Sequence, residues 1–388
     1  MIKISDERNC VGCLACEKVC PKNAIEKTTN SLGFIYPKIN YNKCINCGLC
    51  DKVCPTNNFK SNNNKEPKCF LAWNKNDNIR KNSTSGGVFT ALMNYIFDEK
   101  GVICGVTLDE NFNVKHTVIN CREDMKAFSR AKYVQSSLDN TFVEIKSYLD
   151  DNIKVLFSGT PCQVSGLYNY LGKDYVNLYT VEVICHGVVS QEIFNSYLRS
   201  LTLHYNSTIE NYEFRNKDIS WMDYTSKVTF ASGKIYQNNR LDDPYMMGYL
   251  KHSLYLRPSC TKCMYKSFPR IADITLGDFW GIEKIKDYDT ELGVSAVIVN
   301  SEHGFDIISR VKEQIYCERV DLSDIIKGNP SLIKSSTAGK YTDYFCKKYE
   351  KIDFIDLIHK IDFKDTINRS NLRLIDKLYL LKKYYVNK

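Results

Sequence analysis

The chain has 388 residues and a mass of 44.8 kDa, enough for two or three domains and a sizeable core. Hydrophobic residues make up 43%, charged residues 25% and the formal net charge is +8, a balance that excludes collagen-like and disordered proteins. No apolar run reaches the length of a membrane span, and the polar segment at 1–8 predicts a cytoplasmic protein rather than a secreted one.

The first 56 residues hold eight of the 17 cysteines, arranged in an internal repeat. The two copies, CVGCLACEKVCP and CINCGLCDKVCP, share the spacing C-x2-C-x2-C-x3-C-P of bacterial ferredoxins with two [4Fe–4S] clusters. In that pattern the fourth cysteine of each copy binds the cluster of the other copy. The predicted ligands are Cys10, Cys13, Cys16 and Cys54 for cluster 1, and Cys44, Cys47, Cys50 and Cys20 for cluster 2.

Two zinc knuckles are the alternative interpretation of this segment. Zinc sites usually combine two CxxC pairs that a longer stretch separates, and the repeat does not have this form. Ferredoxin-type clusters pass single electrons, so the module indicates that the rest of the chain accepts or supplies electrons.

The remainder of the chain alternates between predicted strands and helices. The predicted strands cover 69–73, 102–107, 114–119, 154–157, 178–184, 274–276 and 296–300, with a β-rich stretch at 209–236. The predicted helices cover 87–99, 140–149, 163–171 and 191–201. This order predicts an α/β or α+β fold with a mixed sheet. The expected organisation is a ferredoxin module at 1–58, a linker at 59–67, a body in two parts at 68–150 and 151–320, and a helical basic tail at 321–388.

The end of the chain is the most basic part. From 340 to 388 there are 12 lysine and arginine residues and seven acidic ones. The excess indicates either a solvated helical face or a docking surface for an acidic partner. Nucleic acid is not expected as a partner, because no compact basic run is interleaved with aromatic residues.

Four cysteines of the body form a candidate for a third cluster. Cys162, in SGTPCQ, and Cys185, in VICHG, follow predicted strands, and Cys260 and Cys263 form a CxxC motif. Ligands bind at the strand ends of α/β sheets, and four thiols are the number that a [4Fe–4S] cluster requires. Buried free thiols, structural zinc and a redox-active CxxC are the alternatives. His186 adjoins Cys185 and is a candidate proton donor, a partner of a cluster sulfur, or a structural histidine.

Two segments have the composition of a phosphate site. The loop RKNSTSGG at 80–87 places basic side chains, hydroxyls and glycines before a predicted helix, whose first amides attract anions. An ordinary helix cap explains the same residues equally well. The second candidate, Ser158, Gly159 and Thr160, ends a predicted strand.

Several longer motifs together resemble one protein family. SGGVFTAL, AKYVQS, LFSGTPCQ, VICHG, RPSCTKC and DITLGDFWG occur in the order found in the beta subunits of hydrogenases and dehydrogenases that use the deazaflavin coenzyme F-420. That family also includes plant and cyanobacterial chlorophyll(ide) reductases that use ferredoxin. The resemblance covers 3–300, and the N-terminal module is typical of bacterial forms.

The resemblance implies a flavin and a further cluster in the body. It implies that Cys162, Cys185, Cys260 and Cys263 hold a third [4Fe–4S] cluster. It implies FAD near three segments, in which the candidate residues are Ser85, Gly86, Gly87, Lys132, Tyr133, Gln135, Asp278 and Trp280. A helix start and a lysine suit the pyrophosphate, and aromatic residues suit the ring, although core packing also explains Trp280.

These observations predict an iron–sulfur flavoprotein oxidoreductase. A ferredoxin-like or deazaflavin carrier exchanges electrons with the clusters, and FAD transfers two electrons to or from an organic substrate. Relatives with a fused module accompany polysaccharide-building enzymes, so the resemblance points to a small molecule or a sugar. The alternatives are a deazaflavin:ferredoxin oxidoreductase subunit and an electron relay without catalysis. A homo-oligomer is compatible with either.

Overall fold

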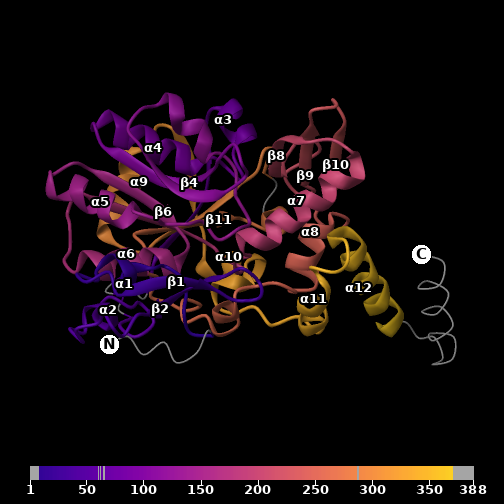
Figure 1. Cartoon of the computed structure of the whole chain (residues 1–388). Coiled ribbons are helices and arrows are strands. Elements are labelled where there is room, and N and C mark those ends of the chain that lie inside the picture. The colour runs from indigo at the N-terminus through magenta and orange to yellow at the C-terminus, as the bar shows by residue number, and fades with distance from the viewer. Residues whose placement is uncertain (1–7, 60, 62, 64–65, 286–287, 370–388) are drawn as a thin grey trace.

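The computed structural model describes residues 8–59, 61, 63, 66–285 and 288–369. The chain forms a small N-terminal module, a body around an eight-stranded mixed sheet, and a lobe of helices with a three-stranded sheet (Figure 1). This architecture confirms the predicted mixed-sheet fold with an N-terminal module and a C-terminal helix. Within the described ranges, no helix has the length and apolar character that crossing a membrane requires.

The module has twofold internal symmetry that follows from the sequence repeat. The hairpin β1 (Ile25–Thr29) and β2 (Ile35–Ile39) is antiparallel, and two short helices, α1 (Ala15–Lys18) and α2 (Leu49–Lys52), follow the cysteine loops. Each helix begins after a residue in the left-handed conformation, Leu14 with φ 56° or Gly48 with φ 76°. These two residues occupy the same position of the repeat, so both loops fold back in the same way.

The large sheet has the order β13-β3-β12-β11-β7-β6-β4-β5. Its strands are β3 (Lys68–Asn74), β4 (Val102–Leu108), β5 (Val114–Ile119), β6 (Val155–Gly159), β7 (Leu178–Val183), β11 (Ile274–Asp278), β12 (Ser295–Val299) and β13 (Ile315–Arg319). Strands β4, β6, β7 and β11 are parallel neighbours, and β3 runs in the same direction because both it and β11 are antiparallel to β12. The carboxyl ends of five strands therefore lie at one edge of the sheet, where ligands bind in such folds.

Helices cover both faces of this sheet. They include α3 (Asp77–Asn82), α4 (Val88–Asp98), α5 (Thr141–Asp150), α6 (Pro161–Leu171) and α9 (Glu302–Arg310), with a 3-10 turn at Glu123–Phe128. One core cluster joins α4 and α9 to the sheet, and another joins α5 and α6 to the module. In the second cluster Cys13 and Ala15 of the module pack with Phe142, Val164 and Leu167. The module is thus attached to the body through a shared apolar core.

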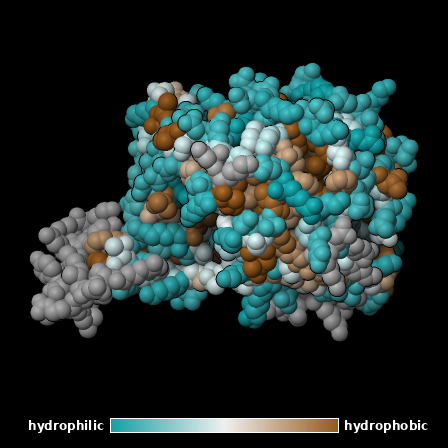
Figure 2. All heavy atoms as spheres, turned by 180° about the vertical axis from the view of Figure 1, so that it is seen from behind, coloured by the Kyte–Doolittle hydropathy of each residue, from teal (hydrophilic) through white to brown (hydrophobic). Residues whose placement is uncertain are grey.

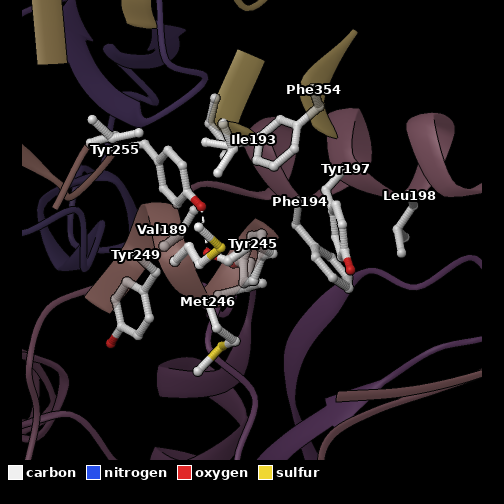
Figure 3. Packing of buried hydrophobic residues seen from close by; sticks show 14 of the residues in the cluster. Val189, Ile193, Phe194, Tyr197, Leu198, Tyr245, Met246, Tyr249, Tyr255 and Phe354 are labelled. Atoms are coloured by element: carbon white, nitrogen blue, oxygen red, sulfur yellow. Dashed lines mark hydrogen bonds between the residues drawn. The ribbon is translucent and has the colours of Figure 1, made fainter. Parts of the chain in front are cut away.

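The second lobe packs around buried aromatic side chains. It contains α7 (Gln191–Tyr205), β8 (Ile209–Asn216), β9 (Thr225–Phe230), β10 (Ile235–Asn239), α8 (Pro244–Met246), the π-helix Met247–Lys251, α11 (Thr342–Lys348) and α12 (Phe354–Arg369). Figure 3 shows Phe194 and Tyr197 of α7 beside Tyr245 of α8 and Phe354 of α12. The hydroxyl of Tyr255 donates to the carbonyl of Tyr245, 2.5 Å away, so this tyrosine is satisfied inside the core.

Most predicted elements match the observed ones within a few residues, and the exceptions have physical causes. Strand β13 was not predicted because Ile315–Arg319 alternates weakly and pairs only at the sheet edge with β3. The π-helix Met247–Lys251 lies in an apolar run that has no clear period. The remaining short elements are 3-10 turns at Pro258–Lys262, Ile282–Lys284 and Pro330–Leu332, and α10 (Leu322–Gly328).

The two expected parts of the body share one sheet, and the expected linker makes hydrogen bonds with the body. Strands from both expected parts of the body, 68–150 and 151–320, belong to one sheet. In the expected linker, Ser61 Oγ donates to the carbonyl of Arg270 at 2.6 Å, and Asn63 Nδ2 donates to three consecutive carbonyls, the closest being that of Ile271 at 2.9 Å. The expected basic tail includes α10, α11 and α12, and residues 370–388 lie outside the described residues.

The surface is mostly hydrophilic, with hydrophobic residues gathered in patches near the middle of the face that Figure 2 shows.

The inner side of α12 is buried against α7, where Leu357, Ile358 and Ile361 are fully covered. In the described part of the expected basic tail, α12 therefore contributes to the core as well as to the surface.

Candidate redox site

The four cysteines predicted for cluster 1 line one cavity. Cys10, Cys13 and Cys16 come from the first loop, and Cys54 ends the second repeat. Burial raises the pKa of the Cys13 and Cys16 thiols, and the charges of neighbouring cysteines raise these pKa values further. Four thiolates crowded in a buried cavity repel one another unless a cation replaces their protons, so this donor set fits an iron–sulfur cluster.

The four cysteines predicted for cluster 2 line a second cavity. Cys20 joins Cys44, Cys47 and Cys50 there, as the crossed pattern of the repeat predicts. This cavity is at the outside of the module, where Cys47 is exposed and the rim residue Ile45 is 58% exposed. Cys13 and Cys16, by contrast, are buried against the body. The module is therefore oriented, with the cluster 1 cavity inside and the cluster 2 cavity outside.

The structure brings the four body cysteines together. Cys162 begins α6 after β6, Cys185 follows β7, and Cys260 and Cys263 belong to the turn at 258–262 and its end. Burial raises the pKa of Cys162 to about 12, and the charges of Cys185 and Cys263 add to this shift. Burial also raises the pKa of Cys260, with contributions from the other three thiols. We call these four residues the body thiol set.

The inner cavity of the module adjoins the body thiol set. The negative charge of Cys162 contributes to the raised pKa of Cys13, which lies in the module. On the next turn of α6, a Cβ atom added to Gly166 would lie 3.1 Å from the sulfur of Cys13. The ring of Tyr265 is buried at the same place, and burial together with the charges of Cys162 and Cys13 raises the pKa of its hydroxyl. The inner cavity of the module therefore adjoins the turn of α6 that follows Cys162.

Gln135 and Arg257 form a polar link between module and body. The amide of Gln135 donates to the carbonyl of Val11 at 2.9 Å and accepts from Arg257 Nη1 at 2.9 Å. Arg257 Nε donates to the carbonyl of Cys10 at 2.8 Å. Gln135 was a predicted flavin residue, and in this structure its side chain contacts the cluster 1 loop.

The predicted phosphate loop has internal partners. The hydroxyl of Ser85 donates to the carbonyl of Val294 at 2.7 Å, and the amide of Gly86 donates to Ser295 Oγ at 2.9 Å. A Cβ atom on Gly86 would lie 2.4 Å from the carbonyl oxygen of Ala72. Gly86 is therefore required by the packing of the loop on the sheet, whether or not a cofactor approaches. Helix α4 begins directly after Gly87, whose φ is 80°. The first backbone amides of this helix have no acceptor within the helix, and they are the groups of this segment that could bind an anion.

Lys132 lies beside this loop. The amide of Ala131 donates to Thr84 Oγ1 at 2.7 Å, which joins the two predicted segments. Lys132 Nζ donates to the carbonyls of Ala127 and Ser129, both at 2.9 Å, so one of its three hydrogens remains free. Burial lowers the pKa of Lys132 to about 7. No carboxylate pairs with Lys132 within the described ranges, so a phosphate would supply the missing charge.

Two basic residues that the sequence did not reveal organise the rest of the predicted flavin site. Arg215, at the end of β8, donates from Nη1 to Asp278 Oδ2 at 2.6 Å and to the hydroxyl of Tyr133 at 3.3 Å. Its Nε atom is buried without a hydrogen-bond partner among the residues that the structure describes. Lys217 Nζ donates to the carbonyls of Arg80, Ser85 and Leu292, at 2.8, 3.1 and 2.6 Å, and so fastens the 80–87 loop. Only the basic character and the β-rich context of 209–236 could have indicated either residue.

Asp278 and Trp280 belong to a packed aromatic cluster. Trp221 Nε1 donates to Asp278 Oδ1 at 2.8 Å, and the rings of Trp221 and Trp280 are stacked with centroids 4.9 Å apart. The guanidinium of Arg240 lies 5.4 Å from the ring of Trp280. Asp278 therefore balances the buried charge of Arg215. Trp280 is partly buried and packs within this cluster, as the core-packing alternative expects.

Ser158, Gly159 and Thr160 lie beside the body thiol set. Thr160 Oγ1 is 3.1 Å from Cys162 Sγ, and the carbonyl of Ser158 is 3.0 Å from Nε2 of the buried His116. Burial lowers the pKa of His116 to about 4, so this ring is neutral. His186 Nε2 is buried without a hydrogen-bond partner, and burial and Lys266 lower the pKa of this histidine. At neutral pH His186 is uncharged, a form that accepts a proton more readily than it donates one.

Comparison with known families decides the identity. Residues 69–141 match the N-terminal domain of the family described as "Coenzyme F420 hydrogenase/dehydrogenase, beta subunit", and residues 153–325 match the C-terminal domain of the same family. The chain belongs to the coenzyme F420 hydrogenase/dehydrogenase beta-subunit family. Residues 9–58 of this family member match the 4Fe-4S dicluster domain, so its module is an iron–sulfur electron-transfer domain. The predicted family is confirmed.

A solved structure has a similar chain. It is the F420-reducing [NiFe] hydrogenase complex from Methanosarcina barkeri, with 18% sequence identity and a TM-score of 0.44. The match covers 79% of this family member and 94% of that chain. A search of curated proteins found no match.

Proposed function

We propose that this family member is an iron–sulfur flavoprotein oxidoreductase with a directed arrangement of redox sites. An external one-electron carrier docks at the cluster 2 cavity, and an organic substrate reacts at an FAD on the carboxyl edge of the large sheet. The observation that carries the proposal is the close packing of Cys13, in the module, on Gly166 of α6, one helical turn from Cys162 of the body. When bound, the clusters would supply one-electron transfer and the flavin would couple it to two-electron chemistry.

The body thiol set would hold a third [4Fe–4S] cluster. Its four thiols lie at strand ends and influence one another electrostatically. Lys266 donates to the carbonyl of Cys185 and lowers the pKa of its thiol, against the opposing effect of burial. Redox-active disulfides need a pair of thiols, whereas here four converge. This favours a cluster over a CxxC couple acting alone.

The flavin phosphates would be held by Lys132 and the first turn of α4. Lys132 offers one free hydrogen and has no acidic partner in the described structure, and the helix start offers unpaired amides. We place the ring system along the strand ends toward Tyr133, Arg215 and Trp280. The unpartnered Nε of Arg215 supports this, because a buried donor without an acceptor is costly.

The carrier would bind at the outer rim of the module. Ile45, which is 58% exposed, and Leu49, which is 37% exposed, line the cluster 2 cavity and give its rim an apolar character. Exposed lysines at 22, 43 and 52 flank it. A small acidic redox protein, such as a ferredoxin or flavodoxin, has the complementary charge, and exposed charges steer association in a salt-dependent way.

Rapid-mixing kinetics test this function. The oxidised holoprotein is mixed anaerobically with a reduced ferredoxin, and reduction of the clusters and the flavin is followed by absorbance. We expect reduction to slow as salt is raised, and to slow further when Lys43 and Lys52 are changed to Glu. Candidate acceptors, a deazaflavin first and then nucleotide sugars, are then mixed with the reduced protein. Reoxidation of the flavin by a small molecule supports an enzyme. Reoxidation only by another protein makes the chain a relay.

A further inference from the structure

Arg257 is buried at the junction of the module and the body. Its side chain is among the largest that are fully buried, with a relative exposure of 1%. The residue precedes the turn that contains Cys260, and the guanidinium reaches the first cysteine loop of the module. Nε donates to the carbonyl of Cys10 at 2.8 Å, and Nη2 donates to the carbonyl of Ile35 at 2.9 Å. Nη2 is also 3.8 Å from the sulfur of Cys10.

The charge of Arg257 has no carboxylate partner among the residues that the structure describes. Its oxygen acceptors are the two carbonyls and the amide oxygen of Gln135, all of them neutral. The aromatic rings of Phe34 and Tyr36 cover the guanidinium at 5.3 and 4.4 Å. The other buried arginines differ, since Arg215 pairs with Asp278 and Arg270 with Glu182.

Burying a charge without a counter-charge costs free energy, and an arginine cannot avoid this cost by losing its proton. The negative groups within its reach would be the cluster-bound thiolates on either side. In the module, Nη2 lies 3.8 Å from the sulfur of Cys10. In the body thiol set, the amide of Cys260 donates to the carbonyl of Arg257 at 2.9 Å, and the charge of Arg257 opposes the larger effect by which burial raises the pKa of Cys162. The guanidinium packs directly on Gly12, where a Cβ atom would lie 2.6 Å from Nη1, so a larger residue at this position would displace Arg257.

We propose that Arg257 is the shared counter-cation of the cluster 1 site and the body thiol set, and that it raises the reduction potentials of both relative to cluster 2. Adding an electron makes a cluster more negative, and a nearby cation in a poorly solvated site stabilises that state. Arg257 would therefore draw electrons inward from the exposed cluster 2 cavity. This inference rests on the proposed function, since it requires clusters at both sites.

The test is a redox titration of the anaerobic holoprotein, followed by electron paramagnetic resonance. In Arg257→Met we expect the ratio of reduced to oxidised inner clusters, at a fixed potential, to fall at least tenfold, which is 59 mV for a one-electron couple. The transition of cluster 2 stays in place as an internal reference, and Cys47→Ser identifies its signal. Arg257→Lys keeps the positive charge but not the planar guanidinium contacts, and it should move the inner transitions much less than Arg257→Met does.

A second variant covers the case in which Arg257→Met loses iron. Gln135→Glu places a carboxylate against Arg257 Nη1 without changing side-chain size, so it cancels the charge and should also lower the inner potentials. Unchanged inner potentials in a variant that keeps its full iron content overturn the inference, as does an equal shift in Arg257→Lys. A wild-type protein without a cluster at the body thiol set would instead refute the proposed function.

Discussion

Replacing Asp278 with Asn should destabilise the protein through the buried charge of Arg215. The side chains of this pair are only 11% and 3% exposed, and their nearest atoms are 2.6 Å apart. Removing one partner of a buried pair costs about 3–5 kcal/mol, because the other charge remains uncompensated. Asn keeps an acceptor for Trp221 Nε1, so we expect the lower end, about 3 kcal/mol. For a chain of this size that corresponds to a fall of about 4 °C in Tm.

Thermal unfolding of the flavin-free protein, followed by circular dichroism, measures this change. Asp289→Asn is the matched control, because Asp289 also pairs with a buried arginine, Arg80, but is 66% exposed. An exposed partner contributes less than about 1 kcal/mol, so this control should shift Tm by no more than about 1 °C. Equal shifts in the two variants would falsify the argument that Asp278 balances a buried cation. Loss of flavin without loss of stability would show instead that Asp278 contacts the cofactor.

Three further predictions concern the thiols, the phosphate site and the loop. Cys162→Ala should remove about four irons and leave those of the module, whereas Cys317→Ala, at the sheet edge, should remove none; iron analysis after anaerobic purification decides this. Flavin affinity should fall as pH rises above about 7, at most tenfold per unit, because a bound phosphate favours the charged form of Lys132; the slope should be lost in Lys132→Met, and fluorescence titrations from pH 6 to 9 measure it. Gly86→Ala should lower Tm even without flavin, since its Cβ meets the carbonyl of Ala72 at 2.4 Å; a normal Tm with reduced flavin content would restore a direct cofactor role for this glycine.

The pH dependence of stability has the same origin and a definite sign. Lys132 has a folded pKa of about 7 and an ordinary value of 10.5. Between these values the unfolded chain binds the additional proton, so unfolding becomes less favourable as pH rises. The unliganded protein should therefore gain stability from pH 7 toward 10, and Lys132→Met should gain less.

The fold was predictable where periodicity is strong. The helix α4 and the strands β4, β5, β6 and β7 have clear apolar patterns, and the observed limits differ little from the predicted ones. The repeat also predicted which cysteines share a cavity, because the crossed ligand pattern follows from twofold symmetry. Edge strand β13 and the π-helix escaped prediction because their burial depends on distant partners rather than on local pattern.

The candidate site was predictable only in part. The strand-end positions of Cys162 and Cys185 could be inferred, since parallel strands end at one edge of the sheet. Arg215 and Lys217 could not be inferred, because they lie far along the chain from the loop and the tyrosine that they contact. Gln135 belongs to the AKYVQS motif, from which the family resemblance implied a flavin contact. Its observed contact with the cluster 1 loop depends on how the module packs on the body, which the sequence does not show.

The central claim is that the body holds a cluster and a flavin in addition to the two clusters of the module. The most direct test is the amount of iron, acid-labile sulfide and released flavin per chain after anaerobic purification and reconstitution. Three [4Fe–4S] clusters with four irons each, together with one flavin, should give about 12 irons, about 12 sulfides and one FAD per chain. About eight irons with no flavin would contradict it, and would leave the chain as a two-cluster electron relay.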